Sequence, residues 1–286
     1  MSVPDHSSVE AFFERVADER FLPTGYTRGP WDAASQHAGP PAALLGRAVQ
    51  TRPGAREDMR LTRITFEIHS PVPLAPLTVT TRVLREGRSV ELVEAALTPD
   101  GGAEVMRARA LRIRTAPGTV PAAGPAAAPG TGPDADPGAA SPEPPVPGPR
   151  QARPEPFFPV PWDTGYHTAV EARFAAGSFL DRGPATCWLR MRVPLVAGEK
   201  TAPLDRVLVA ADSGNGVSNV LDFATHLFVN PDLTVHLHRH PAGEWVCLDA
   251  RTTVDPYGVG MAETALHDEQ GPIGRGVQSL FVAPRR

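Results

Sequence analysis

Residues 204–223 read LDRVLVAADSGNGVSNVLDF, an apolar run with helical periodicity that is interrupted at its centre. The apolar positions before and after the interruption are Leu204, Val207, Leu208 and Ala211, then Val217, Val220 and Leu221. Gly214, Asn215 and Gly216 lie between them, and a glycine costs a helix interior about 1 kcal/mol relative to alanine. We expect a break that presents the Asp212 carboxylate beside freed backbone N–H groups. Alternatively, the glycines separate two ordinary helices and Asp212 is a polar cap.

The 286 residues divide at a segment rich in proline, alanine and glycine. Of the 33 prolines, 15 lie between positions 117 and 161. Residues 116–156 carry almost no aliphatic side chains, so they cannot bury enough apolar surface to offset chain entropy. We therefore expect an N-terminal domain over 1–115, a disordered linker over 116–156 and a C-terminal domain over 157–286.

Both expected domains contain a helix followed by strand-like runs. In the first, an amphipathic helix over 9–17 and an extended segment over 21–31 precede a helix over 40–49 that starts with two prolines. Strands follow over 61–69, 74–84, 89–97 and 103–114. In the second, strands over 167–174 and 185–193 precede the interrupted helix, and further strands cover 224–229, 233–240, 245–254, 258–267 and 273–282. This order predicts an α+β fold in which two antiparallel sheets each wrap around a central helix.

Short motifs add a family resemblance to this order. They are Cys187-Trp188-Leu189-Arg190, Ala210-Ala211-Asp212, His238-Arg239 and Gly276-Val277-Gln278, with Gln36-His37-Ala38-Gly39-Pro40-Pro41 in the first half. The residue types in these motifs and the order of the motifs along the chain resemble those of the acyl-CoA thioesterase II family. The resemblance implies a double hotdog fold, with the two hotdog units joined by the Pro-rich linker. It also implies hydrolysis of acyl-CoA or acyl-carrier-protein thioesters.

The resemblance further implies three catalytic side chains in the C-terminal domain. Asp212 and Gln278 match the family's Asp and Gln, while Asn230 stands where the family has Thr. Thr234 takes that place if the strand register differs. Asp212 would activate the attacking water as a general base, and Asn230 and Gln278 would hold that water.

Backbone and first-domain groups complete the expected site. N–H groups near Gly214 and Asn215 would stabilise the oxyanion. His37 and Gly39, at the start of the first hotdog helix, are assigned to substrate or oxyanion binding. In a simpler interpretation, Gln278 is an ordinary strand residue and Asn230 starts a turn before Pro231.

Other classes of partner receive less support. A net charge of −4 without a dominant basic patch argues against nucleic acid, and no run approaches the roughly 18 apolar residues of a membrane span. The N-terminal residues lack the apolar core of a signal peptide, so we expect a cytoplasmic protein. Cys187 and Cys247 are interpreted as buried small side chains. We expect no cofactor and a homo-oligomer.

Two alternatives to hydrolysis remain. His37 precedes a glycine at a helix start, as the catalytic histidine of hotdog dehydratases does, which indicates a dehydratase or isomerase with Asp212 as its acidic partner. The Asn230 departure instead favours a protein that binds acyl thioesters or a carrier without hydrolysing them. His236, His238 and His240 alternate on one strand face and could bind zinc, but no Cys, Asp or Glu joins them, so no metal is expected. No GxSxG or P-loop sequence is present.

Overall fold

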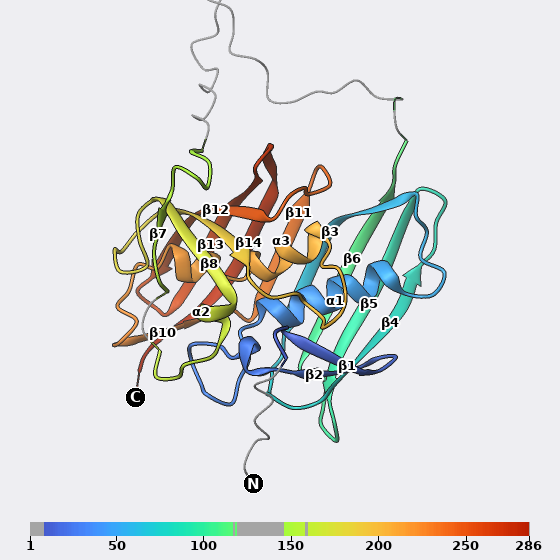
Figure 1. Cartoon of the computed structure of the whole chain (residues 1–286), viewed down its shortest axis with the longest axis horizontal. Coiled ribbons are helices and arrows are strands. Elements are labelled where there is room, and N and C mark those ends of the chain that lie inside the picture. Colours follow the sequence, from blue (N-terminus) through green and yellow to red (C-terminus); the bar gives the residue numbers. More distant parts are fainter. Residues whose placement is uncertain (1–8, 117, 119–145, 158–159, 286) are drawn as a thin grey trace, which may run out of the picture.

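The computed structural model describes residues 9–116, 118, 146–157 and 160–285. Within these residues, fourteen strands form one sheet (Figure 1). Its order is β1-β2-β4-β5-β6-β3-β11-β14-β13-β12-β9-β8-β7, and β10 pairs with β14. Every pairing between these strands is antiparallel. The large antiparallel sheet with few helices agrees with the α+β prediction.

The N-terminal half supplies one end of this sheet and one long helix. Its elements are β1 (Phe13–Ala17), β2 (Arg20–Pro23), the short 3-10 helix η1 (Gly25–Thr27), α1 (Gly39–Thr51), β3 (Met59–Ile68), β4 (Leu77–Arg85), β5 (Val90–Pro99) and β6 (Met106–Arg114). Helix α1 starts with two prolines, whose fixed backbone suits a first helical turn. It packs against β3, β4, β5 and β6, and Ala42, Ala43, Leu44 and Leu45 are buried.

The C-terminal half supplies the other end of the sheet and an interrupted helix. Its elements are β7 (Arg153–Pro154), α2 (Tyr166–Ala169), β8 (Val170–Ala176), β9 (Ala185–Met191), α3 (Pro203–Ala211), α4 (Gly214–Val217), β10 (His226–Val229), β11 (Asp232–Leu237), β12 (Trp245–Asp255), β13 (Val259–Asp268) and β14 (Gly271–Pro284). Helix α3 packs against β9 and β12, and α4 against β12, β13 and β14. No helix in the described part of the chain has the length and apolar character needed to cross a bilayer.

Helices α1 and α3 lie against one another in the core (Figure 1). Glycine permits this close contact at two positions. A Cβ at Gly39 would overlap the carbonyl oxygen of Val209, and a Cβ at Gly46 would overlap the Leu208 side chain. The N-terminal end of α1 therefore reaches the C-terminal end of α3.

The two halves also share a strand pairing, which we call the seam. Strand β3 pairs with β11 from Glu67 opposite Asp232 to Arg63 opposite His236. The Oγ1 atom of Thr234 donates to Oγ1 of Thr65 across this pairing, at 3.1 Å. The sheet therefore continues without interruption from one half to the other.

The expected helix over 9–17 is wrong. Phe13–Ala17 is a strand that pairs with β2, and Phe12 and Phe13 are fully buried. The backbone N–H groups of these two phenylalanines donate to the carbonyls of Pro194 and Leu195. Tertiary pairing with the C-terminal half thus outweighs the helical spacing of the apolar residues.

Most of the predicted linker, residues 117 and 119–145, lies outside the described residues. Its last residues are described, and they belong to the packed C-terminal half. Ala152 is buried in a cluster with Trp188 and Trp245, and the Trp188 Nε1–H donates to the Pro147 carbonyl at 2.7 Å. Strand β7 pairs with β8. The boundary expected at 156 is therefore too late, because proline-rich chain packs here on tryptophan.

Candidate active site

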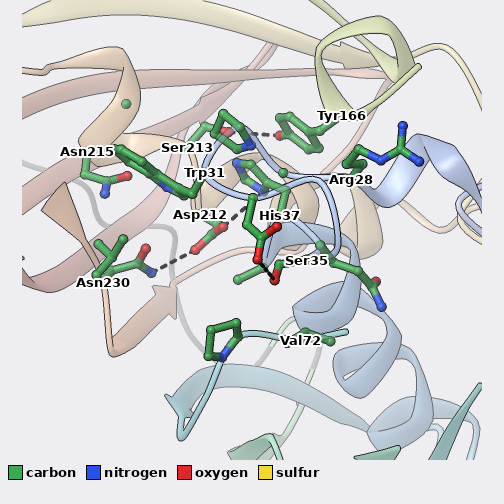
Figure 2. A pocket seen from close by; sticks show the side chains of 18 of the residues that line it. Arg28, Trp31, Ser35, His37, Val72, Tyr166, Asp212, Ser213, Asn215 and Asn230 are labelled. Carbon is green, nitrogen blue, oxygen red and sulfur yellow. Dashed lines mark hydrogen bonds and ion pairs between the residues drawn. The ribbon is translucent and has the colours of Figure 1, made fainter. Parts of the chain in front are cut away.

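A cavity of about 400 Å³ opens where the two halves meet (Figure 2). The N-terminal half lines it with residues between 28 and 38 and between 68 and 72. The C-terminal half lines it with residues at 157, 160, 166, 167 and 179, at 212, 213, 215 and 216, at 223 and 228–231, and at 281. Its volume is in the range of ordinary small-molecule sites.

Asp212 lies on the cavity wall at the break between α3 and α4. Helix α3 ends at Ala211 and α4 begins at Gly214, so the break expected from the glycines is confirmed. A Cβ at Gly214 would lie 2.5 Å from Thr264 Oγ1 and 2.9 Å from Gln278 Oε1, whereas the space beside Gly216 is open. The glycines thus let the broken helix sit directly on β13 and β14.

The Asp212 carboxylate is 6% exposed and contacts one side chain from each half. Its Oδ1 accepts a hydrogen bond from Asn230 Nδ2 at 2.8 Å. Its Oδ2 lies 3.1 Å from Nδ1 of His37, which precedes α1 (Figure 2). The structure therefore brings together three residues that the sequence analysis selected.

The His37 imidazole is held on three sides. Its Nδ1 also accepts from the Gly39 N–H at 3.1 Å, and its ring stacks on Tyr166 with centroids 3.7 Å apart and planes 4° apart. Burial lowers the pKa of His37 below its usual value, and the Asp212 carboxylate only partly opposes this. The neutral imidazole is thus the favoured form near neutral pH.

Tyr166 and Ser213 are functional candidates that the sequence analysis missed. The Tyr166 hydroxyl donates to the Val209 carbonyl at 3.0 Å and lies 2.9 Å from Ser213 Oγ. Since a phenol has one hydrogen, Ser213 is the donor in the second bond. Burial raises the pKa of Tyr166, so the phenol stays protonated. No sequence signal links Tyr166 to position 213, which lies 47 residues away.

Gln278 lies beside the break but does not line the cavity. Its side chain is almost fully buried, its Oε1 accepts from the Asn215 N–H at 3.1 Å, and its Nε2 donates to the Asp212 carbonyl at 3.1 Å. Both ends of the amide are therefore bound to the backbone of the broken helix. This differs from the expected water-holding role for Gln278 and from the expected free N–H of Asn215.

The remaining predicted residues divide between the cavity and the packing around it. Asn215 lines the cavity, and its Nδ2 donates to the Phe228 carbonyl at 3.3 Å. Gly39 and Gly214 permit close contacts behind the cavity wall. Thr234 lies at the seam and does not line the cavity. Among the described residues, no group of three or more His, Cys, Asp or Glu could hold a metal ion.

Comparison with solved structures shows the same fold over nearly the whole chain. A proposed thioesterase II from Thermobifida fusca is 21% identical, with a TM-score of 0.67 and 96% of each chain covered. A proposed thioesterase from Novosphingobium aromaticivorans is 22% identical, with a TM-score of 0.67 over 94% of this chain and 98% of that chain. A hot dog fold protein from Alicyclobacillus acidocaldarius is 15% identical, with a TM-score of 0.69 over 97% of each chain.

Comparison with family models covers both halves of the chain. No curated protein sequence matches significantly. The acyl-CoA thioesterase N-terminal domain matches residues 27–113, which include His37. The acyl-CoA thioesterase C-terminal domain matches residues 142–282, which include Asp212, Asn230 and Gln278. The two matches have the chain order that the sequence motifs predict, and this chain belongs to the acyl-CoA thioesterase family.

Proposed function

We propose that the protein hydrolyses acyl-CoA or acyl-carrier-protein thioesters to a free acid and a thiol. The observation that carries this proposal is the buried Asp212 carboxylate on the cavity wall, bound by Asn230 on one oxygen and in contact with His37 on the other. A carboxylate held in this way can take a proton from a water molecule and aim that water at a bound carbonyl. Family membership supports thioester hydrolysis in general.

The reaction we propose proceeds by addition and elimination. Asp212 removes a proton from water as the water oxygen bonds to the thioester carbonyl carbon. The carbonyl oxygen becomes an oxyanion, and when it reforms the carbonyl the carbon–sulfur bond breaks. The departing thiolate takes back the proton, which leaves Asp212 ionised for the next turnover. No covalent enzyme intermediate is required.

His37 is the second group in this proton transfer. Neither a carboxylate oxygen nor a bare Nδ1 carries a hydrogen, so the 3.1 Å contact is a hydrogen bond only when one proton lies between them. We assign to this pair the storage of the proton taken from water until the thiolate leaves. The lowered pKa of His37 suits this role, because a neutral imidazole can receive that proton.

Asn230 and Gln278 take different positioning roles in our proposal. Asn230 uses its amide to orient the carboxylate and the water beside it. Gln278 fixes the backbone of Asp212 and Asn215 from behind the cavity. Because the Asn215 N–H is engaged there and Gly214 lies behind the cavity wall, we assign oxyanion binding to the backbone at Gly216. Gly216 lines the cavity and has open space beside it.

The contact between His37 and Asp212 also favours a second candidate, a dehydratase or isomerase. An imidazole and a carboxyl group from different halves, facing one cavity, could move protons on an acyl chain. Purified protein given saturated and 2-enoyl thioesters separates the candidates. Hydrolysis releases a free thiol from both substrates. A hydratase instead adds water to the enoyl group and leaves the thioester intact, and that product would replace our assignment.

The division of the chain into two hotdog units is part of the same proposal. We propose that each helix with its strands is one hotdog unit, so that the chain is a double hotdog. Its N-terminal domain covers 1–115, and its C-terminal domain includes the packed residues 147–156 as well as 157–286. The shared core of α1 and α3 and the seam support this organisation. Homo-oligomerisation and a cytoplasmic location remain predictions.

A further inference from the structure

Aromatic side chains are concentrated around the cavity. The chain contains 4 Trp, 3 Tyr and 11 Phe, and seven of these eighteen residues line the cavity. The 28 lining residues make up only about a tenth of the chain. Aromatic residues are therefore about fourfold enriched there, a bias that neither the proton transfer nor the helix break requires.

One aromatic group forms part of the wall of the cavity that Asp212 also lines. Trp31 and Phe223 stack with centroids 4.5 Å apart, and Phe228 meets Trp31 edge-on at 5.1 Å. The Arg285 guanidinium lies 5.1 Å from the Trp31 ring and 4.6 Å from the Phe223 ring, which fixes this pair further. Trp31 appears in the same close view as Asp212 and His37 (Figure 2).

A second group comes from the part of the C-terminal half that precedes α3 in the chain. Phe157 stacks on Phe179 at 4.5 Å and meets Tyr166 edge-on at 5.8 Å. Tyr166 in turn stacks on the imidazole of His37. The second group thus contacts the Asp212–His37 pair through Tyr166, and the first lines the same cavity as that pair.

These rings are more than core packing, because several keep accessible surface. Trp31, Phe157 and Phe223 are only partly buried, and Phe281 is 55% exposed while it lines the cavity. Aromatic rings attract other rings in stacked and edge-on geometries at 4.5–7 Å between centroids. The walls already use both geometries among themselves, and a planar ligand in the cavity would meet the ring surface that lines it.

We propose that the acyl group of the preferred substrate carries an aromatic ring, as in aryl or arylalkanoyl thioesters. A dry cavity of about 150 Å³ is enough for benzene. The cavity of about 400 Å³ therefore has room for a ring, the thioester and the start of the thiol arm. A straight alkyl chain gains burial there, but it gains no ring-to-ring contact and must lose rotational freedom. This inference rests on the proposed function, since it names the substrate class for that site.

The test compares two acyl groups with the same number of carbons, phenylacetyl-CoA and octanoyl-CoA, on the full chain. We expect kcat/KM for phenylacetyl-CoA to exceed that for octanoyl-CoA by tenfold or more. Equal values, or a preference for octanoyl-CoA, would overturn the inference and leave the proposed hydrolysis intact. If neither thioester releases a thiol, the proposed function fails instead. Binding of the corresponding non-hydrolysable thioethers, measured by calorimetry, then decides the ring preference.

Two tryptophan variants identify the wall as the source of the preference. Trp31→Leu should lower the phenylacetyl-to-octanoyl ratio by roughly two- to tenfold, as expected for losing ring contacts. Trp245→Leu is the matched control, because Trp245 also lies beside arginine side chains but does not line the cavity. Its ratio should stay at the wild-type value, whatever happens to its melting temperature. A ratio that is unchanged in Trp31→Leu, or that falls equally in both variants, would contradict the assignment.

Discussion

Helices α1 and α3 occupy comparable places in the two halves and differ in how they end. Helix α1 runs for 13 residues without an acidic side chain or a break. Helix α3 stops after nine residues, and Asp212 and Ser213 separate it from the one-turn helix α4. Of the two residues in contact across the cavity, His37 precedes α1 in the first half, whereas Asp212 interrupts the helix of the second half. The site is thus asymmetric, with a carboxylate from one half and an imidazole from the other.

The largest effect is expected for Asp212→Asn, which keeps the shape of the side chain and removes the proposed general base. Thioester hydrolysis should fall by about 10²- to 10⁴-fold, the scale of a lost general base. Single-turnover thiol release measures the chemical step. Asp205→Asn is the control, because Asp205 is also a buried carboxylate of α3 but lies outside the cavity. A wild-type rate for Asp212→Asn would remove the base assignment.

Asn230 tests whether the carboxylate needs its amide partner. Asn230→Leu leaves Oδ1 of Asp212 without its donor, which costs about 1–3 kcal/mol for a buried group. We expect kcat to fall by roughly ten- to hundredfold. Asn230→Thr should keep most of the rate, because a hydroxyl can also donate. Equal rates and equally lowered melting temperatures in the two variants would make Asn230 only a turn residue.

Replacing Gln278 distinguishes two roles for this side chain, support of the break between α3 and α4 and direct contact with the attacking water. Gln278→Leu leaves the Asn215 N–H and the Asp212 carbonyl unsatisfied, at about 1–3 kcal/mol for each group. Urea unfolding should therefore show a clear loss of stability together with a lower kcat. Ser279→Ala, at the next and exposed position of β14, should change neither quantity. A large loss of kcat with unchanged stability would return Gln278 to the water-holding role.

Asp205, at the first turn of α3, lies outside the cavity, and its replacement tests stability rather than catalysis. The expected effect depends on pH. Burial raises its pKa from the usual 3.8 to about 6. A carboxyl whose folded pKa is raised stabilises the fold below its unfolded pKa, and this contribution is lost as the pH rises through about 6. The stability of wild type relative to Asp205→Asn should therefore fall by about 2–3 kcal/mol between pH 4 and pH 7. Urea unfolding at both pH values checks this, and a constant difference would contradict it.

The sequence predicted those features of the site that are local in the chain. The glycines at 214 and 216 mark the break, and alternating apolar residues mark the strands that support it. The dehydratase or isomerase alternative paired His37 with Asp212 by residue type alone. Their direct contact depends on the packing of α1 against α3 through Gly39, which the local sequence does not encode. The backbone bonds of Gln278 were hidden for a related reason. Strand alternation indicates that this side chain points inward, but not which backbone groups it meets there.

The aromatic walls were also invisible in the sequence. In the structure, Trp31, Phe157, Phe179 and Phe223 all lie in connecting segments outside the helices and strands, and only folding brings them together. The error at 9–17 has the opposite cause. The local spacing there is helical, but Phe12 and Phe13 gain more from burial between the two halves.

The register of the seam between β3 and β11 determines where Asn230 lies relative to Asp212. Asn230 and Pro231 immediately precede β11, Ile68 ends β3, and the Ile68 N–H donates to the Pro231 carbonyl at 2.8 Å. A slip of one residue in this pairing would turn every side chain of the strand to the opposite face. It would also carry Asn230 away from Asp212. The alignment of the Asp212 carboxylate by Asn230 thus depends on the register of two strands from opposite halves. Substitutions at the seam can therefore lower the reaction rate without contacting a reacting atom.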